Sequence, residues 1–299
     1  MLTLSGVPIE DTFAEAFTVT GTRLIVTAAT PEWAHIAATT ATGNATSVIA
    51  CDCEAAIERE LPPLESPDGR PGISVLIFGF SRDQVAAAVQ ARVGQSILTC
   101  PTTACFNGLP DAPKDKQIPL GKGLRHFGDG FQFAKTLAGR RYWRVPVMDG
   151  EFLCEEKAGT IKGVGGGNLL ICGRDPEQAL TAATQAAAAM RSVAGIILPF
   201  PGGIVRSGSK VGSKYKGLKA STNDAYCPTL RGLIPSELPE ECAAVYEIVA
   251  DGLSFEVVQS AMRAGLHAAA RCPGVLKITA GNYGGKLGKH HFHLRELLD

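Results

Sequence analysis

Apolar residues recur along the chain in two patterns: short runs, and stripes with helical spacing. In the first half, the run Leu24–Val26 is followed by Thr30 and Pro31. This is a typical helix start, because a Thr side chain caps free N–H groups and proline suits the first helical position. The pattern predicts a strand, a helix that ends near Thr42, and a second strand over Ser47–Ala50.

The second half repeats this arrangement. Asp175 and Pro176 begin a helical pattern, and the apolar run Ile196–Leu198 follows it. Pro31 and Pro176 are 145 positions apart (176 − 31 = 145), and Glu32 matches Glu177 at the same offset. Because this offset is close to half the chain, we expect an internal duplication.

Each half also contains a second strand–helix–strand pattern. The expected strands are Ile73–Phe78 and Ser96–Thr99 in the first half, and Val245–Val249 and Val275–Thr279 in the second. Ser81 and Ser254 are the expected helix caps between them. Two such units per half predict an α+β fold of two related ferredoxin-like (split βαβ) lobes. We expect the lobes to span residues 1–148 and 149–299, with most of the functional site in the second.

Composition narrows the possible functions. The chain has 299 residues, of which 45% are hydrophobic, and 29 basic residues balance 29 acidic ones. This apolar fraction excludes a disordered chain, and the neutral charge argues against a nucleic-acid partner. No apolar run is long enough for a membrane helix, and the N-terminus does not resemble an export signal. The nine cysteines are therefore expected to be reduced thiols in the cytoplasm.

Several glycine- or cysteine-containing motifs do not carry the chemistry that they suggest. The glycines of Gly163–Asn168 precede an apolar strand rather than a helix, so a tight turn is favoured over a dinucleotide loop. The segment Gly208–Lys214 is one residue short of a nucleoside-triphosphate loop, which leaves an anion-binding loop or a solvated basic loop. Cys51 and Cys53 lack further ligands at suitable spacing, so no metal site is expected.

Three polar segments next to apolar strands are candidates for a site: Pro199–Lys214, Ala220–Thr229 and Ala280–Gly288. Rigid sheets often present functional groups on such loops, although turn chemistry explains the same composition. Glu247 stands between Val245 and Val249 on one face of an expected strand. It is either a solvated strand residue or a desolvated carboxyl with a raised pKa, suited to proton transfer.

Across its whole length the chain resembles the formylmethanofuran:tetrahydromethanopterin formyltransferases. The matching motifs are IEDTFAEAF (Ile9–Phe17), PDGRPG (Pro67–Gly72), FGDG (Phe127–Gly130), GEF (Gly150–Phe152), PFPGGIV (Pro199–Val205), SKVGSK (Ser209–Lys214), STNDAYCPT (Ser221–Thr229), VYEIV (Val245–Val249) and GGKLG (Gly284–Gly288). The resemblance implies a two-lobed α/β enzyme with no tightly bound cofactor, whose co-substrates are methanofuran and tetrahydromethanopterin. It also implies a homodimer or homotetramer.

The neutral charge is similar to that of the form found in methylotrophic bacteria, where the family member belongs to a formyltransferase/hydrolase complex. The resemblance places the catalytic glutamate of the family at Glu247. Oxyanion- and substrate-binding roles are expected for Ser207, Ser209, Lys210, Lys214, Thr222, Asn223, Asp224, Tyr226, Cys227 and Asn282.

The expected reaction is direct formyl transfer from the amine of methanofuran to N5 of the pterin, or the reverse, through a tetrahedral oxyanion. Glu247 exchanges the proton in this scheme. Two alternatives remain: a covalent relay through Cys227, and a non-catalytic scaffold role within the larger complex.

Overall fold

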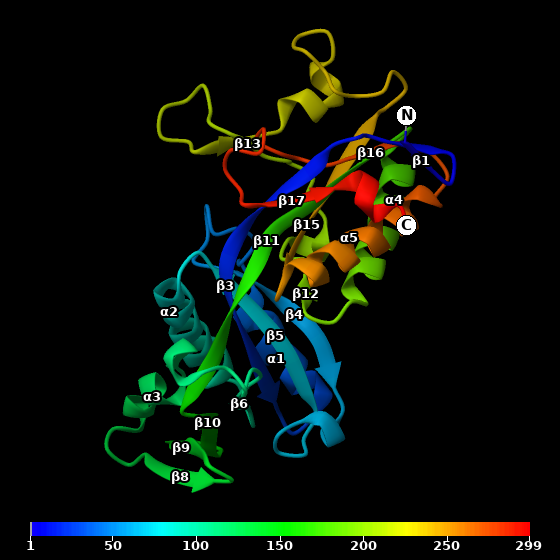
Figure 1. The fold of residues 1–299 in the computed structure, drawn as a ribbon. Helices are drawn as coiled ribbons and strands as arrows, with labels where there is room; N and C mark the ends of the chain where they lie inside the picture. Colours follow the sequence, from blue (N-terminus) through cyan, green and yellow to red (C-terminus); the bar gives the residue numbers. More distant parts are fainter. Residues whose placement is uncertain (1) are drawn as a thin grey trace. The chain divides into compact units, whose positions relative to one another are not determined.

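The computed structural model describes residues 2–299, which form two compact units (Figure 1). Unit 1 contains the chain up to Thr18 together with Val164–Asp299, and unit 2 is Val19–Gly163. The boundaries lie inside two long strands, β3 (Phe13–Thr27) and β11 (Lys157–Gly173). Residues 148 and 149, where the sequence predicts the division of the lobes, lie in a hairpin turn of unit 2.

Unit 2 begins with a β-α-β-β-α-β sequence. After β3 come α1 (Pro31–Thr42), β4 (Glu54–Leu61), β5 (Gly72–Gly79), α2 (Arg82–Arg92) and β6 (Ala104–Asn107). The strands pair in the order β4–β5–β3–β6, and all three pairs are antiparallel. Both helices start as the sequence predicts, because Thr30 and Ser81 accept hydrogen bonds from backbone N–H groups three residues later. Alanines of α1 and valines of α2 form the core with these strands.

The rest of unit 2 extends this sheet. Its elements are β7 (Gln117–Pro119), α3 (Gly121–Leu124), β8 (Phe133–Leu137), β9 (Arg140–Val147) and β10 (Gly150–Glu155). Strand β10 pairs in parallel with β6, and β9 and β8 follow as antiparallel neighbours.

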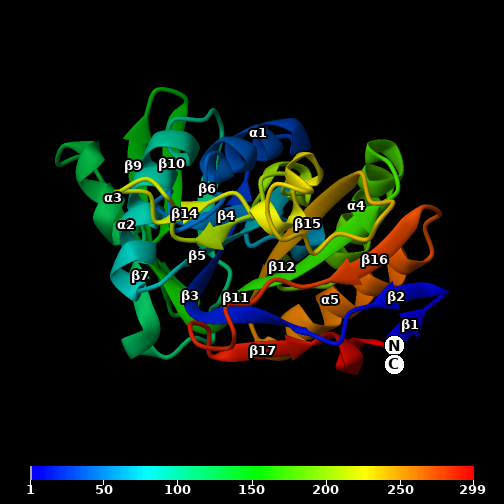
Figure 2. The same cartoon turned by 90° about the horizontal axis from the view of Figure 1, so that it is seen from above.

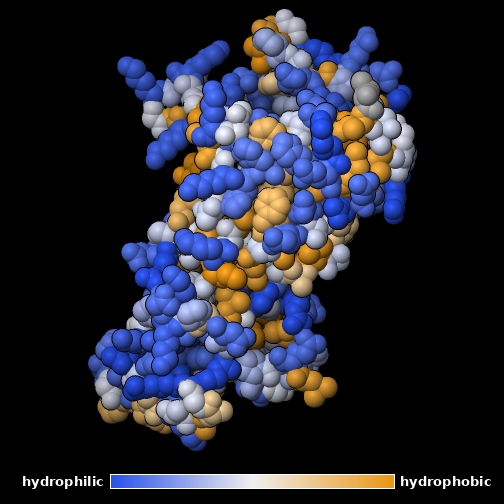
Figure 3. Space-filling model, in the orientation of Figure 1, coloured by the Kyte–Doolittle hydropathy of each residue, from blue (hydrophilic) through white to orange (hydrophobic). Residues whose placement is uncertain are grey.

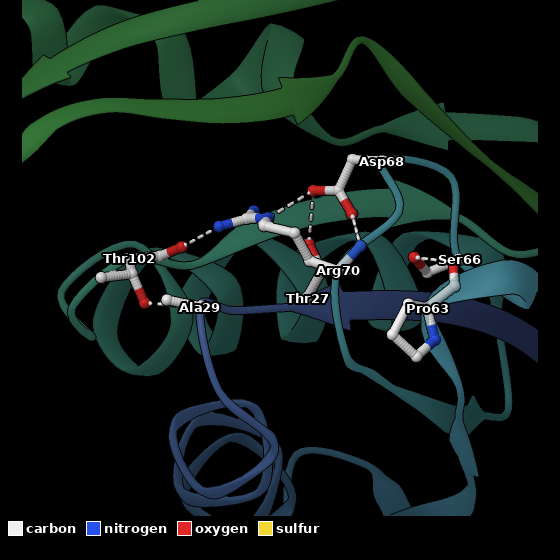
Figure 4. Close-up of polar contacts among 7 residues, drawn as sticks. All are labelled: Thr27, Ala29, Pro63, Ser66, Asp68, Arg70 and Thr102. Atoms are coloured by element: carbon white, nitrogen blue, oxygen red, sulfur yellow. Dashed lines mark hydrogen bonds and ion pairs between the residues drawn. The ribbon is translucent and has the colours of Figure 1, made fainter.

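A polar network fixes the chain before β5 (Figure 4). Asp68 accepts hydrogen bonds from the Thr27 hydroxyl and from Arg70 Nε, each at 2.8 Å. Arg70 also donates to the carbonyl oxygen of Thr102, at 2.5 Å. Thr102 has a φ of 64°, a conformation that costs energy for a β-branched residue, and these contacts hold it there. The PDGRPG segment therefore serves the structure of unit 2.

Unit 1 contains the same order of elements. After β11 come α4 (Pro176–Arg191), β12 (Ile196–Ile197), β13 (Lys210–Val211), β14 (Ala220–Ser221), β15 (Ala244–Gly252), α5 (Phe255–Ala270), β16 (Val275–Thr279) and β17 (His290–His293). Four of these strands pair in the antiparallel order β12–β15–β11–β16. Asp175 and Ser254 cap α4 and α5 as predicted.

The two ends of the chain contribute strands to this unit. β2 (Val7–Ile9) pairs in parallel with β16, and β1 (Leu2–Leu4) pairs with β2, so the three strands lie side by side (Figure 2). Strand β17 pairs with the first residues of β3. Helices α4 and α5 lie against each other, where a Cβ on Gly265 would stand 2.7 Å from the Met190 sulfur. A larger residue at position 265 would force the Met190 side chain to move.

Two predicted strands are wrong. Ser47–Ala50 is a turn, closed by a hydrogen bond from the Ala50 N–H to the Ser47 carbonyl oxygen at 3.1 Å, and β4 starts later. In the predicted strand Ser96–Thr99, Ser96 and Ile97 belong to a π-helical segment, Val93–Ile97, that continues α2, and Leu98 and Thr99 form the turn after it. Ile97 is buried because it extends the four-residue spacing of Val85, Val89 and Val93, so its burial reflects a helical stripe rather than a strand.

The predicted tight turn at Gly163–Asn168 is also wrong. These residues lie within β11, where the pairing with β15 shifts between Gly165 and Gly167. Gly166, with a φ of 94°, forms the bulge, and its N–H donates to Asp251 at 2.9 Å. The glycines therefore permit a β-bulge.

Candidate functional site

Glu247 lies on the face of β15 that points away from the core helices. Ile248 and Ala250, on the opposite face, are fully buried with α4 and α5. Strand alternation therefore directs Glu247 to the other face of the sheet. Backbone hydrogen bonds between Glu247 and Val205, at 2.7 and 2.9 Å, hold the segment after β12 alongside it.

A small pocket of about 30 Å³ lies at Glu247. It is lined by Leu170, Val205, Arg206, Ser207, Gly208, Asn223, Tyr226, Cys227, Val245 and Glu247. A cavity of this size holds one water molecule or a chemical group of similar volume. Four residues singled out in the sequence, Ser207, Asn223, Tyr226 and Cys227, thus meet at Glu247.

Burial raises the pKa of Glu247 from 4.5 to about 7. The residue nevertheless keeps partial solvent exposure. A carboxyl with this pKa exchanges protons readily near neutral pH. Of the two sequence-based interpretations of Glu247, this raised pKa favours the desolvated carboxyl. Burial also raises the pKa of the neighbouring Tyr226 to about 12, so its phenol keeps its proton.

The two segments that carry most of the predicted residues lie against each other. The Thr222 hydroxyl donates to the Ser207 carbonyl oxygen at 2.8 Å, and β13 pairs with β14 through Lys210 and Ser221. Lys210 forms an ion pair with Asp224, and this hydrogen-bonded contact holds the pKa of Asp224 below its usual range. The positive charge of Lys210 is therefore already partnered within the site.

Lys214 is different, because it lies on the exposed part of this segment. It belongs to the projecting loop around β13, together with the exposed Lys216 and Lys219. Hydrophilic side chains project from this loop beside a few exposed apolar ones (Figure 3; the loop is beside the β13 label in Figure 1). The loop is a cationic surface that attracts anions by charge rather than by shape.

The third polar segment meets the site through Tyr283. The Ser209 side chain hydrogen-bonds to the Tyr283 phenol. Burial, followed by the negative charge of Glu247, raises the pKa of that phenol. Asn282 faces elsewhere: its amide nitrogen donates to the Thr12 hydroxyl at 3.1 Å and to the Phe13 carbonyl at 3.2 Å.

Sequence reasoning missed Tyr283 and Glu15, a buried residue with a relative exposure of 1%. The Glu15 carboxylate accepts four hydrogen bonds from backbone N–H groups of the third segment. One signal was present: a glutamate between two alanines in an apolar strand needs partners, and a glycine-rich loop supplies N–H groups. Nothing in the sequence links residues so far apart.

Other candidate sites are not supported in the described part of the chain. Residues 2–299 contain no group of His, Cys, Asp or Glu arranged to hold a metal ion, and the nine cysteines carry free thiols. Larger hollows, of about 460 to 740 Å³, lie in unit 2 and contain none of the predicted site residues. None of the helices in residues 2–299 combines the length and apolar character that a bilayer crossing demands.

Comparison with known proteins identifies the class of molecule. The family model described as formylmethanofuran-tetrahydromethanopterin formyltransferase matches residues 2–147, and the model of the proximal lobe of the same family matches residues 150–297. The chain belongs to this family of transferases.

Individual relatives agree over the full length. The chain is 57% identical to the formylmethanofuran–tetrahydromethanopterin formyltransferase of Methylococcus capsulatus, over 99% of each chain. It is 56% identical to one component of the formyltransferase/hydrolase complex of Methylorubrum extorquens, over 99% of this chain and 97% of the relative.

Two solved structures also match. The first is a crystal structure of the formyltransferase/hydrolase complex from Methylorubrum extorquens with methylofuran, with a TM-score of 0.97, 56% identity, and coverage of 100% of this chain and 99% of the matched one. The second, the Methanosarcina barkeri enzyme, has a TM-score of 0.93, 51% identity, and coverage of 99% and 100%.

Proposed function

We propose that this chain transfers a formyl group between the amine of methanofuran and N5 of tetrahydromethanopterin. Relatives named for this activity match the chain from end to end at 50–57% identity. The observation that carries the site assignment is the pocket at Glu247, which is the size of a small group and combines a carboxyl of pKa about 7 with polar loops.

The reaction exchanges one C–N bond for another. The attacking nitrogen bonds to the formyl carbon, negative charge develops on the formyl oxygen, and the C–N bond to the first nitrogen then breaks. The attacking nitrogen loses a proton and the leaving nitrogen gains one. The enzyme must therefore hold two substrates together, stabilise the oxyanion and move a proton.

Glu247 is our proposed proton carrier. With a pKa of about 7, it is partly protonated and partly ionised at neutral pH, so it takes a proton from one nitrogen and gives it to the other. Ser207 and Asn223 line the same pocket, and Ser209 and Thr222 lie in the segments that border it. These hydroxyl, amide and backbone groups are the proposed oxyanion donors, each lowering the barrier by roughly 3 kcal/mol.

The remaining predicted residues bind or arrange the substrates in this proposal. Lys210, with Asp224, orders the loop, and exposed Lys214 attracts acidic coenzyme tails. Tyr226 and Cys227 line the pocket beside Glu247. Asn282 holds the third segment against the start of β3.

Glu247→Gln tests the assignment. The variant keeps the shape of the side chain but carries no exchangeable carboxyl proton, so kcat falls by about 100-fold or more, measured spectrophotometrically with both coenzymes. Glu241→Gln, an exposed change in the same unit, is the matched control and keeps the parental rate. A near-parental rate for Glu247→Gln removes Glu247 from the mechanism.

A covalent relay through Cys227 is the second candidate, because this thiol lines the pocket with Glu247. Cys227→Ala separates the two mechanisms: the direct route retains its rate, whereas a relay through a thioester loses nearly all of it. Activity of the purified chain alone excludes a pure scaffold role.

The fold of the lobes, the oligomeric state and the partners are also part of this proposal. The antiparallel strand orders β4–β5–β3–β6 and β12–β15–β11–β16 support two ferredoxin-like lobes that arose by duplication. We further propose a division of function near residues 148 and 149, assembly as a homodimer or homotetramer, association with formyltransferase/hydrolase subunits, and activity in the cytoplasm without a tightly bound cofactor. Light scattering of the purified chain, alone and with the partner subunits, tests the assembly.

A further inference from the structure

Glu15 is a buried carboxylate that the proposed mechanism does not use. It lies in the part of β3 that belongs to unit 1. Its Oε2 accepts hydrogen bonds from the N–H groups of Tyr283 and Gly285, at 2.6 and 2.9 Å. Its Oε1 accepts from those of Leu287 and Gly288, both at 2.6 Å. Burial alone raises the pKa of this carboxyl, but the four N–H donors outweigh burial and hold the pKa below its usual range.

The loop wraps around this carboxylate closely. Gly284 and Gly285 have φ values of 71°, a backbone conformation that lets the N–H groups on either side of Gly284 point at Glu15. A Cβ on Gly288 would stand 2.4 Å from the Ala16 carbonyl oxygen, so the backbone approaches β3 as closely as glycine allows. Asn282 fixes the start of the loop through its bonds to the beginning of β3.

Tyr283 connects this loop to the site. Its N–H is held by Glu15, its ring centroid lies 6.3 Å from that of Phe17, and its phenol is hydrogen-bonded to Ser209. The charge of Glu247 acts on the same phenol. Tyr283 therefore lies close enough to both Ser209 and the proposed proton carrier to feel them, and Glu15 determines where its backbone sits.

We propose that Glu15 is a positioning residue, whose four-donor hydrogen-bonding site fixes Tyr283 against Ser209 and keeps water away from Glu247. This inference rests on the proposed role of Glu247. It gives the IEDTFAEAF and GGKLG segments one shared task, although 268 residues separate Glu15 from Tyr283. A displaced Tyr283 admits water to the site, which returns the titration of Glu247 toward the ordinary carboxyl range.

The test compares the pH dependence of kcat in the full-length enzyme and its variants. Glu15→Gln replaces one acceptor oxygen with an NH₂ group that faces N–H donors, so it breaks two of the four bonds. We expect kcat at pH 7 to fall about tenfold or more and the titration midpoint to move down by about one unit. Tyr283→Ala produces the same shift, and the double variant shows no further change.

Two controls distinguish positioning from loss of stability. Asp175→Ala removes the cap of α4 in the same unit, so it lowers the thermal midpoint without moving the pH profile. Amide hydrogen exchange of residues 283–288 accelerates in Glu15→Gln and stays unchanged in Asp175→Ala.

The inference is overturned if Glu15→Gln retains the parental pH midpoint, or if the effects of Glu15→Gln and Tyr283→Ala simply add. Glu247→Gln is measured in parallel. If that variant loses the rate while Glu15→Gln leaves the profile unchanged, the positioning role alone fails. If Glu247→Gln is fully active, the proton-carrier assignment fails, and this inference fails with it.

Discussion

Replacing Glu247 with glutamine should stabilise the folded chain, and only at higher pH. Burial raises the pKa of this carboxyl from 4.5 to about 7. Because the folded pKa exceeds the unfolded one, the folded state binds the proton more tightly. Below about pH 4.5 the carboxyl is protonated in both the folded and the unfolded chain, so its burial carries no cost from charge. The cost grows as the pH rises, and it is complete above about pH 7.

The size of the effect follows from the shift. One pKa unit corresponds to about 1.4 kcal/mol, so ionised Glu247 costs the folded state about 3 kcal/mol above neutral pH. Glutamine has nearly the same volume and does not ionise. Other effects of the substitution on the free energy of unfolding are the same at every pH. The part of the difference in unfolding free energy that changes with pH therefore comes from ionisation of the Glu247 carboxyl.

The assay is thermal unfolding of the parent and of Glu247→Gln from pH 5 to pH 8.5. The difference in midpoint should grow in favour of the variant by about 5 °C across this range. Glu241→Gln, at the exposed surface, should give a constant difference. A constant difference for Glu247→Gln as well would refute the argument, because it would mean that Glu247 titrates alike in both states. A difference that grows with pH would mean that the buried Glu247 carboxyl lowers the stability of the folded chain while its pKa lies near neutral pH, where it can exchange protons.

Three further outcomes follow from the contacts described above. Phe292→Ala removes a fully buried ring stacked on Phe255, so the free energy of unfolding in denaturant should fall by about 3–5 kcal/mol. Gly288→Ala places a methyl group against the Ala16 carbonyl, so the thermal midpoint should fall, whereas the same change at open Gly284 should cost less. Lys214→Ala should raise KM for the acidic coenzymes without changing kcat and should weaken the salt dependence of KM; an unchanged KM would exclude its steering role.

Local signals predicted much of the fold. Helix starts were correct at Thr30, Ser81, Asp175 and Ser254, because a cap depends on residues within one turn. Strand ends were less predictable, since an apolar segment such as Ile97–Leu98 is buried equally well on a helix that continues. Of the long strands β3 and β11, only the apolar C-terminal parts were predicted, because glycines and polar residues interrupt the apolar pattern of the rest.

The candidate site also contains residues that the local sequence predicts and residues that it does not. Glu247 stood out because its neighbours in the sequence are also its neighbours on the strand. The polar composition of two segments next to strands pointed to Ser207, Asn223, Tyr226 and Cys227, the resemblance supplied their expected roles, and the four line the pocket with Glu247. Glu15 could not be found in this way, because its partners lie at the other end of the chain. Residues that hold a site together over long sequence separations are visible only once the chain is folded.

The composition of unit 1 has a consequence for how the chain folds as it leaves the ribosome. Unit 2 is complete once Gly163 has emerged, so it can fold while the rest is still being made. The first eighteen residues belong to unit 1, and their strand partners β16 and β17 are made almost last. At about 10 residues per second, the N-terminal strands wait roughly 25 seconds with unpaired edges. Such edges pair readily with other chains, so early chaperone binding at the N-terminus would favour a high yield of folded protein.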